Sequence, residues 1–218
     1  MDWGKFNWGN ISKKDIDFYK KETEKHIYEK YFQVEENDIV VDIGSSNGIF
    51  TLSILDKKPL HCWCIEPDRD NFILLFDNLK GHPVSFIRGA ISNEKEVEIE
   101  WVGKYKVYGI KFQEFVQYYC IDKIDFLKID CEGGEYLIFT EENVNYLKNV
   151  KKIAIEFHLR SDENKKLFRN FRDNILPHFK NFEISSQNNV NIKWDLHNEH
   201  FIEWYKEILI YIDNRNDK

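Results

Sequence analysis

Three carboxylates crowd around a double glycine in the segment DFLKIDCEGGE, which covers residues 125–135. They belong to Asp130, Glu132 and Glu135. Like charges held this close repel one another, so the arrangement costs stability and favours a functional role. The alternative is a solvated acidic turn that caps the next helix. Lys128 lies on the same strand face as Asp130 and is expected to balance part of the charge.

Glu156 and His158 end another apolar run, KKIAIEFHL at 151–159, and their spacing of two puts them on one strand face. A neutral histidine that a carboxylate orients can take the proton of a hydroxyl group. We therefore assign catalytic roles to Asp130, Glu156 and His158, and expect no metal. Two alternatives stay open: these three side chains hold a divalent metal, or His158 is purely structural.

A glycine-containing loop follows the first apolar run in VVDIGSSNGIF, residues 40–50. A dinucleotide site would need G-x-G-x-x-G, but Ser46 stands where the middle glycine would be, and the Gly-Lys-Ser/Thr of a P-loop is absent. Asp42 would repel phosphates but can face an ammonium group. S-adenosylmethionine carries an ammonium, a carboxylate and no phosphate, so the loop between Gly44 and Gly48 suits that cofactor.

Glu66 supports the same cofactor. It ends the second apolar run in CIEPD (64–68), 18 residues after Gly48, where an acid can accept both hydroxyl protons of a ribose. Nicotinamide cofactors use an acid at the same place, so Glu66 alone does not distinguish the two cofactors. The loop and Glu66 together favour S-adenosylmethionine over a nicotinamide cofactor. The alternative is an ordinary glycine turn beside an exposed acid.

The elements that must position these residues alternate between short apolar runs and helical patterns, which predicts a mostly parallel α/β sheet covered on both faces. Five strands are predicted first, at 39–43, 60–65, 84–90, 125–130 and 151–159. Closing strands are predicted at 183–186, 190–194 and 207–213. We expect one domain over 1–218, with an N-terminal arm and helix at 1–35 and an inserted hairpin at 96–112.

Composition and charge limit the kinds of partner that the protein is expected to bind. The 218 residues are 42% hydrophobic and 32% charged, with a formal net charge of −7, which disfavours nucleic acid as a partner. No apolar run is long enough to span a bilayer, and the N-terminus lacks the features of a signal peptide. We expect a cytoplasmic protein, in a host's cytoplasm if the source is viral, that does not bind membranes. The four cysteines have no C-x₂-C spacing and are expected to be free thiols.

Four segments, VVDIGSSNGIFTL, IEPD, FLKIDCEGGE and IEFH, resemble in this order the FkbM-type methyltransferases. The resemblance runs from about Val40 to His158, and K-I-D-x-E-G-x-E is its most specific part. It implies the class I methyltransferase fold, a Rossmann-like sheet of seven strands with the last antiparallel. It also implies methylation of hydroxyl groups, mostly on sugars of glycans or on polyketide-type natural products.

Roles carried over from the family fall on matching positions. The family often has Gly-Ala where this chain has Gly44-Ser45, a mild change. In this resemblance Asp130 and Glu132 lie at the junction between donor and acceptor, and Glu66 holds the ribose. The remaining cofactor-binding residues would line the methionine part or flank the adenine: Asp42, Gly44, Asn47 and Gly48, and Ala90 and Ile91.

Two aromatic segments are candidates for binding the acceptor. Trp3, Phe6 and Trp8 precede the first helix, and Trp101, Tyr105 and Tyr108 lie in the hairpin. Such rings can stack on sugar faces, although an arm packed against the core is the simpler interpretation of the N-terminal group.

The sequence therefore predicts an S-adenosylmethionine-dependent O-methyltransferase that acts on a sugar, a glycan or another small molecule with a hydroxyl group. The alternatives are an N-methyltransferase of a small amine or protein, a natural-product O-methyltransferase, and a silent scaffold that binds S-adenosylmethionine. The Asn/Asp-Pro-Pro-Tyr/Phe stretch of exocyclic-amine enzymes is absent, which disfavours the first of these.

Overall fold

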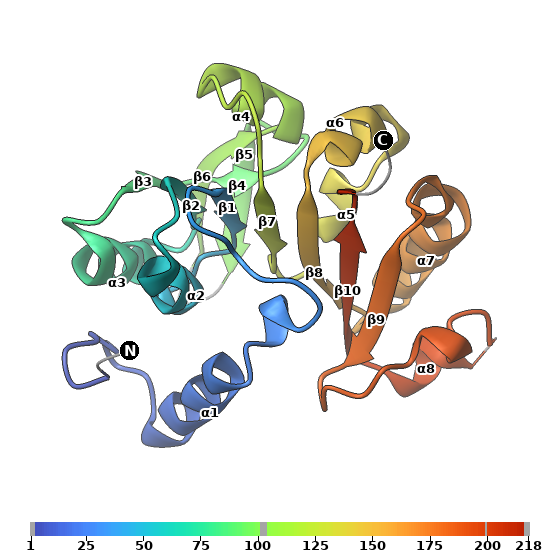
Figure 1. The fold of residues 1–218 in the computed structure, drawn as a ribbon, viewed down its shortest axis with the longest axis horizontal. Helices are drawn as coiled ribbons and strands as arrows, with labels where there is room; N and C mark the ends of the chain where they lie inside the picture. Colours follow the sequence, from blue (N-terminus) through green and yellow to red (C-terminus); the bar gives the residue numbers. More distant parts are fainter. Residues whose placement is uncertain (1–2, 101–103, 199, 216–218) are drawn as a thin grey trace.

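A twisted seven-stranded sheet forms the centre of the molecule in the computed structural model, which describes residues 3–100, 104–198 and 200–215 (Figure 1). Its strand order is β3-β2-β1-β7-β8-β10-β9. The strands are β1 (Ile39–Ile43), β2 (His61–Ile65), β3 (Val84–Ile87), β7 (Phe126–Ile129), β8 (Lys152–His158), β9 (Phe182–Ser186) and β10 (Glu207–Asp213).

The pairing confirms the predicted fold class. Strands β3, β2, β1, β7 and β8 run parallel, and β10 pairs antiparallel with both β8 and β9. The central runs are apolar at nearly every position because both faces of a parallel sheet are covered. The last strand enters the sheet antiparallel, as expected for the class I methyltransferase sheet.

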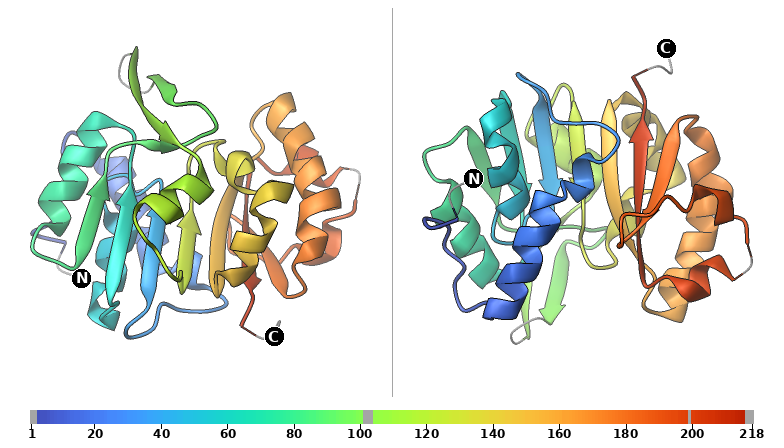
Figure 2. Two further views of the ribbon diagram at one scale, coloured as in Figure 1. Left: turned by 90° about the horizontal axis from the view of Figure 1, so that it is seen from above. Right: turned by 60° about the horizontal axis from the view of Figure 1, so that its bottom comes forward.

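Helices cover both faces of this sheet (Figure 2). Side chains of successive strand residues point to opposite faces of the sheet, and each face has its own hydrophobic core. Val41 and Leu127 pack with helices α4 to α7 on one face, and Val40 and Phe126 pack with α2 and α3 on the other. The helices are α1 (Lys13–Glu24), α2 (Ile49–Ile54), α3 (Arg69–Leu79), α4 (Phe112–Tyr118), α5 (Glu135–Ile138), α6 (Val144–Asn149), α7 (Asp162–Asn170) and α8 (Phe201–Trp204).

The predicted hairpin is present between β3 and α4. Strands β5 (Glu96–Glu100) and β6 (Lys104–Ile110) pair antiparallel, and the short β4 (Ala90–Ile91) adds to β6 in a second, three-stranded sheet. The hairpin ends earlier than expected, because Phe112 already begins helix α4.

The strand predicted at 190–194 is wrong. Only Asn191 bridges to β9, through Ser185, and the chain then turns into a 3-10 helix at Lys193–Asp195. The side chain of Asn191 accepts a hydrogen bond from the backbone N–H of Lys193, which closes a local turn in place of further strand pairing.

Within the ranges that the structure describes, no helix is both long and apolar enough to cross a bilayer.

Candidate active site

The loop after β1 is held tightly against the end of β7. Gly44 adopts a positive φ of 76°, and a Cβ atom at this position would lie 1.7 Å from the carbonyl oxygen of Asp130. Both Gly44 and Ser45 donate backbone hydrogen bonds to the carbonyl of Ile65 at the end of β2. Only glycine fits here, because the loop must approach two neighbouring strand ends at once.

Gly48 permits a second close approach. Its φ is 87°, and a Cβ atom would lie 2.9 Å from the side chain of Leu79 in α3. This glycine therefore lets α2 start close against α3.

Glu66 is buried beside this loop, 5% exposed. Its two carboxylate oxygens accept hydrogen bonds of 2.8 Å, one from the backbone N–H of Ser46 and one from that of Asp68. Burial raises the pKa of Glu66 to about 7, even though these two donors lower it. Glu66 thus links the glycine loop to the loop after β2, at the position predicted for ribose binding.

Lys128 lies between two acids: Asp130, as the shared strand face predicted, and Asp42, which was not predicted. Its Nζ atom is 3.1 Å from Oδ1 of Asp42 and 3.8 Å from Oδ2 of Asp130, and it donates to the carbonyl of Gly44 at 2.6 Å. Burial lowers the pKa of Lys128, but the charges of Asp42 and Asp130 outweigh burial and hold the pKa above its ordinary value. Asp42 also accepts a hydrogen bond from Thr51 and is fully buried beneath the loop.

A cavity of about 510 Å³ opens between α1 and the carboxyl ends of β1, β7 and β8. In Figure 1, α1 and the turn after it run past the end of the sheet to which the arrow of β7 points. The acids Asp130, Glu132 and Glu156 line the cavity together with His158 and Lys128. Other lining residues come from α1, the loop after β1 and the turn after β9, namely Phe18, Tyr19, Lys21, Thr23, Lys25, Gly44, Ser45, Ser46, Gln187 and Asn188.

Tyr28 joins the two central carboxylates of the cavity. Its hydroxyl lies 2.8 Å from Oδ2 of Asp130 and 3.0 Å from Oε2 of Glu156. Burial, and then the charges of these two acids, hold the pKa of Tyr28 well above its ordinary value, so the hydroxyl keeps its proton. Burial, and then the charge of Asp130, raise the pKa of Glu156 to about 7.

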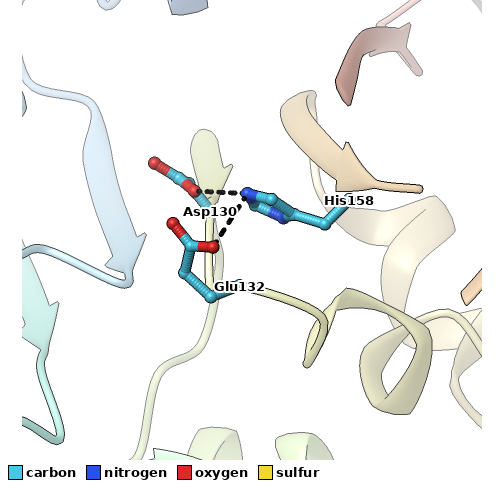
Figure 3. Close-up of side chains that lie close together, drawn as sticks. All are labelled: Asp130, Glu132 and His158. Atoms are coloured by element: carbon cyan, nitrogen blue, oxygen red, sulfur yellow. Dashed lines mark ion pairs between the residues drawn. The ribbon is translucent and has the colours of Figure 1, made fainter. Parts of the chain in front are cut away.

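His158 is fixed from behind by Glu135. The Nδ1 atom of the ring lies 2.7 Å from Oε1 of Glu135, whose side chain is fully buried. The Nε2 atom faces the cavity, 3.8 Å from Oδ1 of Asp130 and 3.5 Å from Oε2 of Glu132 (Figure 3). Burial lowers the pKa of His158, but the hydrogen bond to Glu135 and the surrounding charges outweigh burial and raise the pKa to about 9.

The structure brings part of the predicted site together. The cavity gathers Asp130, Glu132, Glu156, His158 and Gly44. The other predicted cofactor residues lie outside its lining: Asp42, Asn47, Gly48, Glu66, Ala90 and Ile91. Of these, Asn47 is buried and its carbonyl accepts a hydrogen bond from Asn78 of α3, and Ala90 and Ile91 form β4.

The aromatic segments lie elsewhere. Phe6 packs edge-on against Trp8, and Asn7 exchanges hydrogen bonds with Asn78 of α3, so the N-terminal arm is packed against the core. In the hairpin, Tyr105 donates to Asp68, in the loop after β2. Trp101 lies outside the described residues, and Tyr105 and Tyr108 are not among the residues that line the cavity.

Sequence reasoning missed Tyr28 and Phe18. Tyr28 lies in the 3-10 helix Ile27–Glu29 after α1, and Phe18 is an exposed residue of α1 itself. No spacing or motif in the predicted N-terminal arm and helix singles out either residue.

Comparison with known proteins agrees with this architecture. An rRNA methylase from Streptococcus thermophilus has a TM-score of 0.50 at 10% identity, covering 94% of this chain and 98% of its own. A provisionally assigned rRNA methylase from Clostridium thermocellum has a TM-score of 0.52 at 12% identity, covering 94% and 99%. A provisionally assigned Haloferax volcanii methyltransferase, solved with the Trm112 methyltransferase activator, also reaches 0.52 at 12% identity, covering 92% of each chain. These identities show a shared fold alone.

Sequence comparison identifies the family. No curated protein matches the chain. The profile of the methyltransferase FkbM domain, however, matches residues 75–184, which is just over half of the chain and contains the KIDCEGGE segment and the end of β8. The protein therefore belongs to the FkbM methyltransferase family, and it is an S-adenosylmethionine-dependent methyltransferase.

Proposed function

We propose that the protein is an O-methyltransferase whose acceptor is a hydroxyl group of a sugar or glycan. The observation that carries this proposal is the cavity at the strand ends, whose lining combines a pair of carboxylates with exposed aromatic side chains of α1. Phe18 is 56% exposed and Tyr19 is 36% exposed, so both rings are available to stack on a sugar face. Gln187 and Asn188 offer amide groups that can hydrogen-bond to hydroxyls.

The residues present fit S-adenosylmethionine. The buried carboxylate of Glu66 is already fixed by two backbone donors, and each of its oxygens keeps lone pairs for the hydroxyls of a ribose. The cavity lining includes the acids Asp130, Glu132 and Glu156, which suit a cofactor that carries positive charge and no phosphate. When bound, this cofactor supplies an activated methyl group. Glu66 and the loop from Gly44 to Gly48 would hold it.

We assign to the carboxylates of Asp130 and Glu156 the role of taking the proton from the acceptor hydroxyl. Both side chains line the cavity, and the single hydroxyl of Tyr28 lies within hydrogen-bond distance of both, which brings them together. A base held within hydrogen-bond distance of the acceptor oxygen can take its proton as the methyl group is transferred. His158 carries a second proton in the free protein at neutral pH because its pKa is about 9, so the carboxylates are the better acceptors.

Other acceptors are less well supported. The solved neighbours include rRNA methylases, but the net charge of −7 disfavours a polyphosphate chain as acceptor. Natural-product hydroxyls, amines and a catalytically silent scaffold remain as outcomes of the experiment. A cytoplasmic location is part of this proposal.

The test incubates the purified protein with methyl-labelled S-adenosylmethionine and a panel of mono- and oligosaccharides, with and without a chelator. We expect label transfer to at least one sugar. Asp130→Asn and Glu156→Gln should each lower kcat about 100-fold or more with cofactor binding retained. Phe18→Ala should raise the KM of the sugar, whereas the control Phe76→Ala removes a comparably exposed ring from α3 and should not.

Two results would contradict the proposal. Label transfer to amines or to natural-product hydroxyls, with none to sugars, would replace the acceptor class. Full turnover in both carboxylate variants would show that neither Asp130 nor Glu156 accepts the proton.

A further inference from the structure

We propose that Asp130, Glu132 and His158 form a binding site for a divalent metal ion at the floor of the cavity. One atom from each side chain lies within 4.8 Å of the other two. The Nε2 atom of His158 is 3.8 Å from Asp130 Oδ1 and 3.5 Å from Glu132 Oε2. Bonds of about 2.1 Å would place neighbouring ligand atoms about 3.4 Å apart around a tetrahedral ion and about 3.0 Å apart around an octahedral one, so modest side-chain movements close the site.

The second observation is the way in which His158 is held. Its side chain is 3% exposed, and no hydrogen bond to Nε2 is found among the residues that the structure describes. The Nδ1 atom is hydrogen-bonded to the buried Glu135, so Nε2 is aimed at the two carboxylates (Figure 3). Metal-binding histidines use this arrangement, in which a carboxylate behind the ring fixes its orientation and its tautomer.

Glu135 is itself fixed in this supporting position. Its Oε1 atom also accepts hydrogen bonds of 3.2 Å from the backbone N–H groups of Cys131 and Gly133. The turn that carries Glu132 is thereby tied to the carboxylate that orients His158. This also explains the crowding of acids in KIDCEGGE: Asp130 and Glu132 are ligands, and Glu135 is the support of the third ligand.

Arg160 is the group that a metal must displace. Its guanidinium group pairs with Glu132 and with Glu207, and it lies at the cavity edge. A metal at the site would compete with this cation for the Glu132 carboxylate. Arg160 therefore provides a test. If the site binds a metal, removal of the guanidinium group should strengthen metal binding. If instead Arg160 alone holds these side chains together, its removal should weaken their arrangement.

The ligand set indicates the kind of metal. One imidazole with two carboxylates suits Mn²⁺ or Zn²⁺ better than Mg²⁺, which prefers oxygen ligands and bound water. Three protein ligands leave further coordination positions open towards the cavity, as in catalytic metal sites. If the proposed function is correct, two neighbouring oxygens of the acceptor would fill these positions, and Glu156 would remain as the carboxylate that faces the acceptor.

The experiment measures Mn²⁺ alone, by the loss of the EPR signal of the free ion on titration into chelator-treated protein without cofactor. We expect one site per chain with a Kd below about 100 µM, a value corresponding to roughly 5.5 kcal/mol of binding free energy. Glu132→Gln and His158→Ala should each weaken binding at least tenfold, and Glu135→Gln should weaken it 10- to 100-fold. Arg160→Gln should tighten it severalfold.

Glu203→Gln is the matched control, since Glu203 is an exposed acid that pairs with Lys165 away from the cavity. It makes the same change of charge as Glu132→Gln and should leave Mn²⁺ binding unchanged. Glu132 is 49% exposed, so Glu132→Gln keeps the test valid if His158→Ala does not fold.

The proposal is overturned if Mn²⁺ fails to bind, or if it binds equally well to wild type and to Glu132→Gln. Because this titration uses neither cofactor nor acceptor, its failure would leave the proposed methyl transfer untouched. Conversely, a protein that binds Mn²⁺ as described but methylates no sugar would contradict the proposed function and not the metal site.

Discussion

Glu66 is a buried carboxylate that must be ionised to accept hydrogen bonds from two hydroxyls. Burial raises the pKa of Glu66 to about 7 in the free protein, so Glu66 holds a proton below that pH and releases it above. Cofactor binding that requires the ionised form should weaken as the pH falls below 7, approaching tenfold per pH unit, and should level off above 7. Calorimetric titration with S-adenosylhomocysteine between pH 5.5 and 8.5 measures this dependence.

Glu66→Gln provides the control for this prediction. At pH 8 the variant should bind about 10- to 100-fold more weakly, because hydrogen bonds to a charged group are lost. It should also lose the part of the pH dependence that belongs to Glu66. Glu141→Gln, an exposed acid outside the cavity, should behave like the wild type. An unchanged pH profile in Glu66→Gln would show that Glu66 does not bind the cofactor.

Substitution of Tyr28 tests whether Asp130 and Glu156 must be held in place for catalysis. Tyr28→Phe removes the hydroxyl that contacts both Asp130 and Glu156. We expect the free energy of unfolding to fall by about 1–3 kcal/mol, because two half-buried acids lose a donor. The kcat should fall at least tenfold while cofactor affinity stays within a few-fold, since Tyr28 is not among the residues assigned to the cofactor.

Tyr31→Phe is the control for Tyr28→Phe. Tyr31 lies three residues further along, accepts a hydrogen bond from Asn191 and does not line the cavity. Tyr31→Phe should leave kcat unchanged. Equal losses of kcat in the two variants would mean that Tyr28 acts only through the stability of this segment.

At the scale of elements, the loop between β1 and α2 depends on close contact with the end of β7. Gly44→Ala would bring a methyl group against the Asp130 carbonyl, whereas Gly81→Ala places one at a similar positive φ of 90° with nothing within 4 Å. Both variants place an alanine in the left-handed region of backbone conformation, which costs about 1 kcal/mol in strain. Gly44→Ala should cost at least about 2 kcal/mol more in unfolding free energy and weaken cofactor binding, as denaturant titration and calorimetry can measure.

The comparison isolates the steric clash from the backbone strain. Equal destabilisation by Gly44→Ala and Gly81→Ala would show that the loop can move away from β7. The approach of the two elements would then not be what positions the loop.

The sequence allowed those parts of the site to be predicted that depend on local periodicity. Alternation along a strand places Lys128 with Asp130, and Glu156 with His158, and the ends of parallel strands meet at one sheet edge. Tyr28 could not be predicted, because its position depends on how the segment after α1 packs across strands more than 100 residues away in sequence. Asp42 is held beneath the loop by Thr51 and Lys128, contacts that no spacing rule indicates.

At the scale of the whole molecule, the site depends on segments outside the matched family region of 75–184. Strands β1 and β2 supply the glycine loop and Glu66, and the N-terminal helix α1 covers the cavity. Strand β10 lies between β8 and β9, and its first residue, Glu207, reaches Arg160 at the cavity edge. The matched region carries the acidic turn, whereas the cavity is completed by both ends of the chain.

The charge of the whole molecule bears on the choice between a sugar and a nucleic acid as the acceptor. A net charge of −7 should repel a phosphate backbone. We expect no change in the fluorescence anisotropy of a labelled 20-nucleotide RNA with up to 10 µM protein at 50 mM salt, with or without S-adenosylhomocysteine. Binding that weakens steeply as salt is added would instead reveal a basic patch that contacts phosphates, and would contradict the choice of a sugar over a nucleic acid as acceptor.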